Sequence, residues 1–499
     1  MPVPDTPSIG PREQKAAAAL LRASAAPALE LGRVFARHGY QLALVGGTVR
    51  DVFLGRGHTD LDLATDALPD QILGIVRGWA DNVWETGIEF GTVGLRKGPA
   101  LFEVTTYRSE TYRPESRKPV TRFGTSLEGD LRRRDFTVNA MAARLPSLEL
   151  ADPFGGLRDL RDKVLRTPGS PAESFTDDPL RIMRAARFTA QLGFAVVPEV
   201  GVAMHDLAGR LSVVSAERIR DELSKLMLAP GAGPVRGIEL LVGTDVAAVV
   251  LPEVPRLRLE TDEHMRHKDV YQHSLTVLQQ SIDLEPRYGL PPDLVLRLAA
   301  LLHDIGKPKT RSLLPDGRVA FHHHEAVGAA LARSRLKALR FPAAVVDQVG
   351  TLIALHLRFH GYGEWTDSAV RRYVRDAGPQ LTRLHVLTRA DCTTRNKAKA
   401  ARLARAQDGL EERIAQLSAQ EELKKIRPDL DGHQIMQILG LPPGRDVGRA
   451  SQYLLDLRME HGPLGAERAT HELLGWAERE GISGSPDVPP DDGSRPASQ

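Results

Sequence analysis

The spacing of hydrophobic residues changes once along the 499-residue chain. Between about residues 40 and 150, helical patches separate short runs with β-strand character, namely QLALVGG, TDLDLAT, GTVGLR, LFEVTTYR and VNAMAARL. From about residue 175 onward, apolar residues recur at helical spacing, as in DDPLRIMRAARFTAQLGF and LVLRLAALLHDIG. We therefore expect an α/β or α+β head followed by an all-α remainder.

A chain of this length is too long for one hydrophobic core, so several domains are expected. The two ends have the composition of disordered segments, with Pro, Gly, Ser and Asp abundant at the C-terminus. The prolines of LPEVPRLRLE, residues 251–260, indicate a boundary before a histidine-rich region. The predicted segments are a disordered N-terminus 1–13, a mixed head 14–165, a helical neck 166–255, a histidine-rich helical domain 256–400, a helical tail 401–480 and a disordered C-terminus 481–499.

The stretch LVGGTVRDVFLGRGHTDLDLATD, residues 44–66, combines a glycine turn with paired acids. Gly46 and Gly47 follow a short apolar strand and lead into a helix, where backbone N–H groups approach an anion closely. Arg50 lies in the first turn of that helix and is placed to reach the same anion. Asp60 and Asp62 alternate with leucines, so they share one strand face and repel each other unless cations lie between them. Hard oxygen ligands of this kind indicate Mg²⁺ bound together with phosphates.

These motifs resemble the class II branch of the polymerase-β-like nucleotidyltransferases, the family of tRNA nucleotidyltransferases and bacterial poly(A) polymerases. Three downstream motifs agree with it in order: LRRRDFTVNAMA (131–142), ADPFGGLRDL (151–160) and DDPLRIMRAARF (177–188). A small departure is that Asp177-Asp178 stands where the family usually has Glu-Asp. The resemblance covers about residues 40–230 and implies a polymerase-β-like α/β (α+β) head followed by an all-α neck, body and tail.

The reaction implied by this resemblance is attack of an RNA 3′-hydroxyl on the α-phosphate of an NTP, with pyrophosphate leaving. Phosphoryl transfer of this kind needs positioning and charge neutralisation more than covalent chemistry from the protein. The catalytic residues would be Asp60 and Asp62, which would hold two Mg²⁺ ions. Glu103 is either a third carboxylate near these metals or an exposed strand residue.

Further nucleotide contacts follow from the motifs. Gly46, Gly47 and Arg50 would hold the triphosphate, as would Arg134, whose counterpart in the family binds NTP. Asp135 and Asn139 are implied as ribose contacts.

The last motif predicts how C and A are chosen without a template. Both bases present an amino donor beside a ring-nitrogen acceptor, whereas U and G present the reverse. Asp178 and Arg181 lie three apart on a predicted helix, so the carboxylate accepts from the amino group while the guanidinium donates to the ring nitrogen. Arg184 and Arg187 continue the same stripe toward phosphate or stacking contacts.

A second constellation begins in LAALLHDIGKPKT (298–310), where a histidine and an aspartate are adjacent at a predicted helix end. It resembles the HD metal-phosphohydrolase superfamily. The ligands that this resemblance implies are His273, His303, Asp304, His324, His356 and Asp391. Imidazole and carboxylate together suit one or two divalent transition-metal ions. A working site predicts phosphatase or 2′,3′-cyclic phosphodiesterase activity, whereas an idle one leaves the domain as an RNA-binding body.

Within the family, the motifs favour addition of CCA to tRNA, with CTP and ATP as substrates, over poly(A) synthesis. The poly(A) branch typically carries a Gly-Arg-Arg-Phe-type motif, where this chain has ETGIEFGTVGLR (85–96) and VTTYRSETYR (104–113). The basic loop 108–124 resembles the flexible loop needed for the switch to A, and residues 426–448 resemble the tail that grips the tRNA elbow. The alternatives are a poly(A) polymerase, an enzyme that adds only CC or A, an RNA phosphohydrolase with an inactive head, and a non-catalytic RNA-binding module.

The composition of the chain indicates a local pattern of charge and a cellular compartment. The net charge is only +2, but Tyr107–Arg134 holds eight Lys or Arg against four acids, which suits a polyanionic partner or a solvated loop. Cys392 is the single cysteine, which excludes an intramolecular disulfide, and no signal or membrane-spanning segment is expected near the N-terminus. We therefore expect a cytoplasmic protein without a membrane partner. No sequence feature indicates an oligomeric state.

Overall fold

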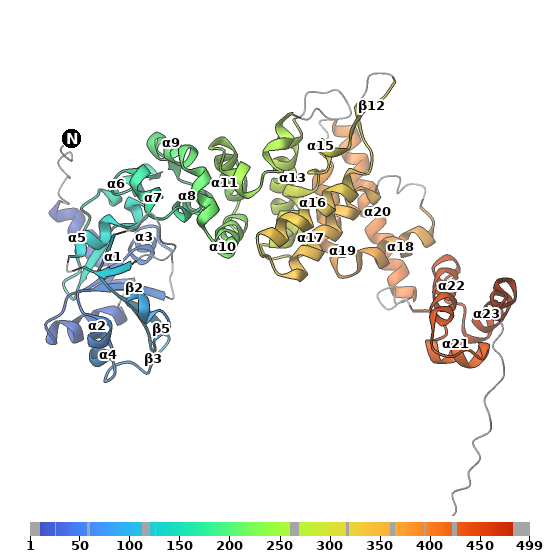
Figure 1. Ribbon diagram of the computed structural model, residues 1–499, viewed down its shortest axis with the longest axis horizontal. Helices are drawn as coiled ribbons and strands as arrows, with labels where there is room; N and C mark the ends of the chain where they lie inside the picture. The colour runs from blue at the N-terminus through green and yellow to red at the C-terminus, as the bar shows by residue number, and fades with distance from the viewer. Residues whose placement is uncertain are drawn as a thin grey trace, which may run out of the picture.

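The structure is a computed structural model that describes residues 10–24, 26–56, 60–111, 120–124, 126–259, 269–315, 319–359, 365–393, 396–421 and 427–482. Residues 1–9 and 483–499, which belong to the two segments predicted to be disordered, lie outside these ranges. Figure 1 shows a mixed head at one end, then a helical neck, a helical body and a small helical tail in succession. The predicted fold class is confirmed by this succession.

The head is built on a seven-stranded mixed sheet with the order β3-β4-β5-β2-β1-β8-β9. The strands are β1 (Leu42–Val45), β2 (Asp60–Thr65), β3 (Asn82–Trp84), β4 (Thr92–Lys97), β5 (Ala100–Thr106), β8 (Ala142–Leu145) and β9 (Glu149–Ala151). Neighbouring strands are antiparallel except β2 and β5, which run parallel. Each β-rich run expected from the sequence contains a strand, but VNAMAARL starts in a 3-10 helix, Thr137–Asn139, and becomes β8 only at Ala142.

The two faces of this sheet differ because side chains alternate along each strand. One face contributes Leu61, Leu63, Phe102 and Val104 to the hydrophobic core under α2 (Ala26–Arg37) and α4 (Pro69–Val76). The opposite face carries Asp60 and Asp62, and we call it the catalytic face. The other head helices are α1 (Pro11–Ser24), α3 (Gly47–Phe53), α5 (Leu127–Arg132) and α6 (Gly156–Asp162).

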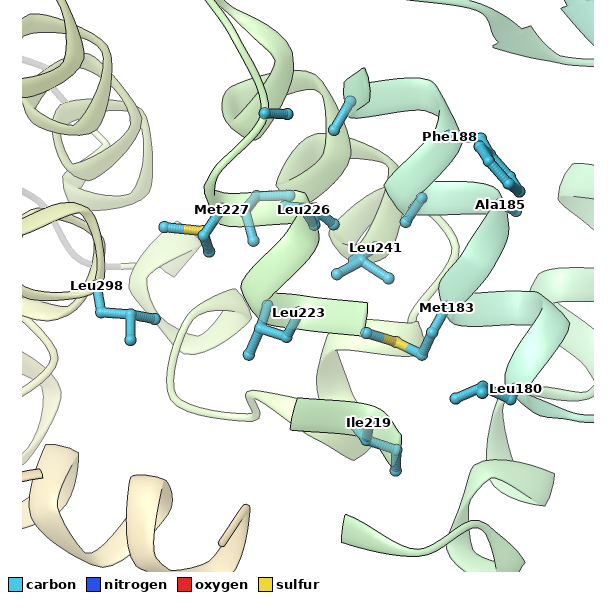
Figure 2. Packing of buried hydrophobic residues seen from close by; sticks show 14 of the residues in the cluster. Leu180, Met183, Ala185, Phe188, Ile219, Leu223, Leu226, Met227, Leu241 and Leu298 are labelled. Atoms are coloured by element: carbon cyan, nitrogen blue, oxygen red, sulfur yellow. The ribbon is translucent and has the colours of Figure 1, made fainter. Parts of the chain in front are cut away.

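The neck joins the head to the body through one continuous core. Its helices are α7 (Pro171–Asp177), α8 (Leu180–Leu192), α9 (Pro198–Asp206), α10 (Ala216–Met227), α11 (Gly233–Gly243) and α12 (Val246–Val250). Figure 2 shows Met183 of α8, Leu223 of α10 and Leu241 of α11 converging between these helices. Met227 at the end of α10 and Leu298 of the body belong to the same cluster, so the hydrophobic core does not stop at the neck.

The body and tail are helical. The body contains α13 (Val270–Leu284), α14 (Leu294–Leu302), α15 (Lys307–Thr310), α16 (His324–Ala338), α17 (Ala343–Leu355), α18 (Asp367–Ala377), α19 (Leu381–Asp391) and α20 (Lys397–Glu421), with a hairpin of β12 (Arg311–Leu313) and β13 (Val319–Phe321). The tail contains α21 (Gly432–Leu439), α22 (Arg445–His461) and α23 (Ala466–Glu480) around a separate small core. Arg371 of α18 reaches the tail, where its Nη1 donates to the carbonyl of Met459 at 3.0 Å. Within the described ranges, no helix combines the length and apolar character that a bilayer span requires. The domain boundaries stay predictions.

Candidate functional site

Three carboxylates lie together on the catalytic face of the head. Asp62 of β2 is the register partner of Glu103 on the parallel strand β5, and Asp60 precedes Asp62 by two residues on the same face. Burial raises the pKa of Asp62, and the negative charges of Glu103 and Asp60 raise it further, while Arg134 and Arg50 oppose the shift. A cluster of hard oxygen donors whose charges repel one another fits a divalent cation. Glu103 is an exposed strand residue whose register also places it beside Asp62, so its part in binding a metal stays a prediction.

The glycine turn lies beside these carboxylates. Gly46 has φ +69°, and a Cβ there would lie 2.7 Å from Arg134 Nη1, so glycine leaves space for that guanidinium beside Asp62. The Arg134 guanidinium donates to Asp130 Oδ2 at 3.1 Å, which holds it in this orientation. Thr48, the second residue of α3, accepts the Asp62 N–H at 3.1 Å. The threonine was not predicted, although it directly follows the glycine pair.

Arg50 lies next to this turn with its guanidinium already bound. Its side chain is buried, donates to both carboxylate oxygens of Asp51 at 2.9 Å, and donates to Asn139 Oδ1 at 2.7 Å. A Cβ on Gly47 would lie 3.5 Å from Arg50 Nη2, so the guanidinium does border the predicted anion site. Its predicted contact with a triphosphate stays a prediction.

Asp135 connects the head to α8. Its Oδ2 accepts from Arg184 Nε at 2.7 Å, and its Oδ1 accepts from Asn139 Nδ2 at 2.9 Å and from the Phe136 N–H at 2.8 Å. Burial opposes ionisation, but the Arg184 charge and these hydrogen bonds lower the pKa of Asp135 to about 2. The side chain implied as a ribose contact is therefore an ionised anchor between head and neck in this structure.

Three predicted arginines surround one phenyl ring. The guanidinium carbons of Arg187, Arg50 and Arg184 lie 4.0, 5.2 and 5.5 Å from the centroid of Phe188, within cation–π range. Arg187 also donates to Glu222 Oε2 at 2.5 Å. Phe188 is the last residue of the motif DDPLRIMRAARF, and its role as the common support of these cations was not predicted.

The helical pairing of Asp178 with Arg181 that the sequence predicted is absent from the described structure. Asp178 is extended (φ −138°, ψ 95°) and lies before α8, which begins at Leu180. The physical reason is Pro179, because the residue before a proline is disfavoured in the helical region. Asp178 Oδ1 accepts the Leu180 N–H at 3.2 Å, while Arg181 Nη1 donates to Ser174 Oγ at 2.7 Å. Both side chains lie near the end of α7, but not as neighbours on one helix face.

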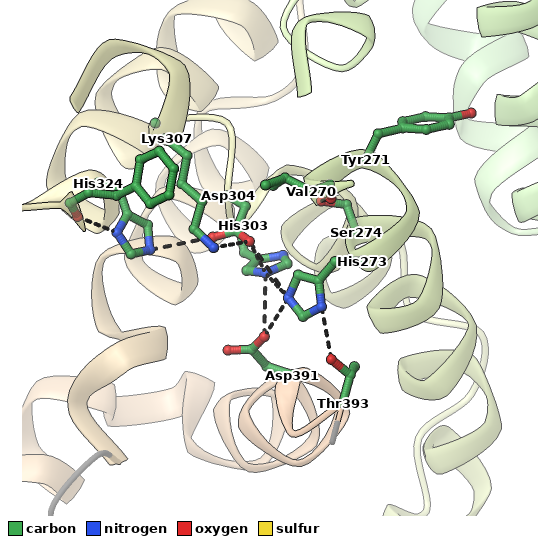
Figure 3. A network of polar contacts seen from close by, with 12 residues as sticks. Val270, Tyr271, His273, Ser274, His303, Asp304, Lys307, His324, Asp391 and Thr393 are labelled. Carbon is green, nitrogen blue, oxygen red and sulfur yellow. Dashed lines mark hydrogen bonds and ion pairs between the residues drawn. The ribbon is translucent and has the colours of Figure 1, made fainter. Parts of the chain in front are cut away.

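The body brings together the six residues implied by the HD resemblance. Figure 3 labels five of them, namely His273, His303, Asp304, His324 and Asp391. The sixth, His356, has its ring centroid 5.2 Å from that of His303 and 5.4 Å from that of His324. They come from the ends or first turns of five helices: His273 in α13, His303 and Asp304 after α14, His324 opening α16, His356 after α17, and Asp391 closing α19. Helix caps fix two of these elements, since Asp269 accepts the Tyr271 N–H and Asp293 accepts the Leu296 N–H at 3.0 Å each. Two groups that share Asp304, namely His273-His303-Asp304 and Asp304-His324-His356, have ligand atoms within 4.8 Å of one another and could each hold a metal ion, while Asp391 belongs to neither group.

The histidine orientations fit a metal. The Nδ1 atoms of His303, His324 and His356 lie 2.9, 2.8 and 2.6 Å from backbone carbonyls, so each donates from Nδ1 and turns Nε2 inward. His356 Nε2 is buried and has no hydrogen-bond partner among the residues that the structure describes. Burial, followed by the charge of His303, lowers the pKa of His356 to about 4, so its imidazole is neutral, as a metal ligand requires.

The carboxylates in this cluster attract positive charge. Burial opposes protonation of His303, but Asp304 and Asp391 raise its pKa to about 10. His273 Nε2 lies 2.9 Å from Asp391 Oδ1, and Lys307 Nζ lies 2.9 Å from Asp304 Oδ2. The lysine was not predicted, although its position three residues after Asp304 at a helix end is visible in the sequence. The buried carboxylate of Asp304 and the half-buried one of Asp391, both in contact with imidazoles, suit divalent cations.

Comparison with known proteins finds relatives for the regions that hold both groups of residues. Sequence models match the chain in three places: the Poly A polymerase head domain at residues 42–166, the probable RNA and SrmB-binding site of polymerase A at 193–257, and the HD domain at 270–396. An A-adding tRNA nucleotidyltransferase of Deinococcus radiodurans is 34% identical over 445 residues, which cover 87% of this chain and 95% of the relative. A CCA-adding enzyme of Geobacillus thermodenitrificans is 34% identical over 341 residues, covering 68% of this chain and 72% of the relative.

Comparison with solved structures also finds CCA-adding enzymes. The crystal structure of the Bacillus stearothermophilus CCA-adding enzyme in complex with CTP superposes with a TM-score of 0.62 and 26% identity. The match covers 91% of this chain and 98% of that one. The likeness therefore extends over head, neck, body and tail.

Proposed function

Because this chain belongs to the tRNA nucleotidyltransferase family, we propose that it completes the 3′-CCA end of tRNA from CTP and ATP. The observation that carries the proposal is the cross-strand pair of Asp62 and Glu103, with Asp60 beside it, next to a glycine turn. Mg²⁺ is the proposed cation, and the cytoplasm, where tRNA is processed and where a lone cysteine stays reduced, is the proposed compartment.

The residues of the head divide the task of phosphoryl transfer. Asp60 and Asp62 would hold a divalent cation, which would supply positive charge where the attacking and leaving oxygens of the reaction lie. Arg134, oriented by Asp130, places a guanidinium over the glycine turn, where it would bind the triphosphate. Thr48 fixes the strand that bears the aspartates against the start of α3, so the carboxylates and the phosphate site keep one geometry.

Recognition of tRNA is proposed for the helical part of the chain. Lys397, Lys399, Arg402 and Arg405 are exposed along the first half of α20, which suits contacts with phosphates that follow shape more than sequence. The tail helices α21 to α23 are the proposed site for the tRNA elbow. The predicted flexible loop 108–124 falls partly outside the described residues, and its ends form the paired strands β6 (Arg108–Thr111) and β7 (Val120–Phe123).

The test is incorporation of labelled CTP and ATP, singly and together, into tRNA lacking CCA, into tRNA ending in CC, and into an unstructured RNA. We expect C, C and A in that order on tRNA alone, and loss of all incorporation in Asp60→Ala and Asp62→Ala. The D. radiodurans relative makes A-only addition the specific rival. Addition of A to tRNA ending in CC, without addition of C to the shorter tRNA, would establish that rival, and long A tails would establish a poly(A) polymerase.

A second activity, metal-dependent phosphohydrolysis, is proposed for the body. It is favoured by the two potential ligand groups that share Asp304 and by the unpartnered Nε2 of His356. The ligands would be His273, His303, Asp304, His324, His356 and Asp391, and a transition metal held there would polarise a phosphate and activate water.

This activity is tested with 2′,3′-cyclic AMP and p-nitrophenyl phosphate in the presence of Mg²⁺, Mn²⁺, Co²⁺ or Ni²⁺. Asp304→Asn should abolish hydrolysis and keep nucleotide addition, whereas Asp60→Ala should do the opposite. Absence of hydrolysis with every metal would leave the body as a scaffold for RNA.

A further inference from the structure

An exposed tryptophan lies in the same cross-strand row as the catalytic carboxylates. Register pairs Asp62 of β2 with Glu103 of β5, Glu103 with Gly94 of β4, and Gly94 with Trp84 of β3. Directly paired residues point to one face, so Trp84 belongs to the catalytic face. Trp84 is one of four tryptophans in the chain, and 36% of its surface is exposed.

The indole lies over the glycine between it and Glu103. A Cβ built on Gly94 would overlap Trp84 Nε1, so the ring occupies the space where a side chain of β4 would stand. Gly94 itself is buried beneath it. The five-membered part of the indole ring therefore covers β4 at Gly94 and forms a floor two strand spacings, roughly 10 Å, from Asp62.

This floor is on the side of the carboxylates opposite to the nucleotide-binding elements. Gly46 follows β1, and Arg134 and Asp135 precede β8, all on the β1 side of β2. β3 is the outermost strand on the other side, and Figure 1 shows it at the part of the head far from α8. The incoming NTP would thus occupy one side of Asp62, which leaves the side of Trp84 for the attacking strand.

The surroundings of Trp84 have the chemistry of a surface for single-stranded RNA. Arg96, in the neighbouring row of the catalytic face, is exposed, and Arg108 Nη2 donates to Thr92 Oγ1 on the same face at 3.0 Å. Phe123 is 41% exposed and lies over Gly91, where a Cβ would be 2.7 Å from its ring. Exposed aromatic rings interleaved with arginines bind single strands by stacking on bases and by contacts with phosphates.

We propose that Trp84 is a stacking platform for a base of the single-stranded RNA 3′ end, next to the nucleotide that carries the attacking hydroxyl. The inference rests on the proposed function. Trp84 is a positioning residue, because it would hold the strand and would not touch the reacting atoms.

The main experiment compares Trp84→Leu and Trp84→Phe with wild type in single-nucleotide addition at saturating CTP. Leucine keeps an apolar cover over Gly94 without an aromatic face, whereas phenylalanine keeps the face. We expect the KM for tRNA to rise roughly 5- to 150-fold in Trp84→Leu. In Trp84→Phe the KM for tRNA should return most of the way to the wild-type value. The KM for CTP should stay within twofold of wild type in both variants. Leu68→Ala, an exposed apolar residue on the N-terminal side of α4, is the matched control and should leave both constants unchanged.

A second measurement needs neither a variant nor turnover. RNA carrying 4-thiouridine at one of its last three positions is crosslinked to the wild-type protein, and the tryptic peptide 78–96, which contains Trp84, should carry the crosslink. An unchanged KM for tRNA in Trp84→Leu, a rise in the KM for CTP instead, or crosslinks confined to other peptides would each overturn the proposal. Wild-type protein that incorporates no nucleotide would instead contradict the proposed function, and the crosslink would still decide where RNA lies.

Discussion

Asp135 of the head and Arg184 of α8 form an ion pair across the seam between head and neck, with Nε and Oδ2 2.7 Å apart. The pair ends a chain of hydrogen bonds in which Arg50 donates to Asn139 and Asn139 donates to Asp135. One polar network thereby connects α3 and the Asp135–Asn139 segment, both in the head, with α8 of the neck. The proposed binding of a nucleotide beside these residues would depend on this network keeping its shape.

Asp135→Asn should destabilise the protein by about 2–3 kcal/mol, because it leaves the half-buried Arg184 guanidinium without its anion. This value is below that of a fully buried pair because about a third of the Arg184 side chain is exposed. Urea unfolding at pH 7 measures the change. Asp162→Asn, which removes an exposed partner of Arg158, is the control and should cost less than about 1 kcal/mol.

The same pair predicts a pH dependence. Folding lowers the pKa of Asp135 from 3.8 to about 2, so its ionised form contributes stability above the unfolded value and loses it as pH falls through the folded value. The difference in free energy of unfolding between wild type and Asp135→Asn should be constant above about pH 5 and shrink between about pH 4 and pH 2. A difference that persists unchanged at about pH 2 would contradict this origin of the stability.

Glu103→Gln should lower kcat by roughly 10- to 100-fold and raise the Mg²⁺ concentration needed for half-maximal nucleotide addition. The reason is its register with Asp62, which makes it part of the carboxylate cluster. The KM for tRNA should not change. Glu89→Gln, an exposed acid elsewhere in the head, is the matched variant, and equal Mg²⁺ requirements in the two variants would exclude Glu103 from the cluster.

Arg297→Met should destabilise the protein by about 3–5 kcal/mol, since it leaves a buried carboxylate unpaired. Arg297 is 2% exposed, donates to both oxygens of Glu285 at 2.7–2.8 Å, and donates to the carbonyls of Met227 and Ala229 at the end of the neck. Adding Glu285→Gln should recover part of the loss. Arg287→Met, from an exposed pair with Asp408, should have an effect below about 1 kcal/mol in the same unfolding assay.

Phe188→Leu should raise the KM for NTP several-fold, because Arg50, Arg184 and Arg187 lose the ring that orients them. The free energy of unfolding should fall by about 1–3 kcal/mol. Phe194→Leu removes a similarly buried ring from the neck and separates the two effects. If both variants lose stability alike and bind NTP alike, the ring has only a packing role.

The sequence by itself determined the features that depend on local spacing. Alternation along one strand put Asp60 and Asp62 on a common face, and helical periodicity after about residue 175 gave the all-α remainder. The histidine-aspartate pair at the end of an apolar helix was readable in the same way. Such patterns can be recognised from the sequence alone because each one involves only residues that are close together along the chain.

Other relationships came from the tertiary structure. Glu103 lies beside Asp62, and Trp84 lies in the same cross-strand row, only because β2, β5, β4 and β3 pair in one register. The sequence does not reveal this register, because Asp62 and Glu103 lie far apart along the chain. The extended backbone at Asp178 shows that a single proline outweighed helical spacing. The six residues of the body converge because the ends or first turns of five helices meet in one buried place, and packing of those helices sets that meeting point.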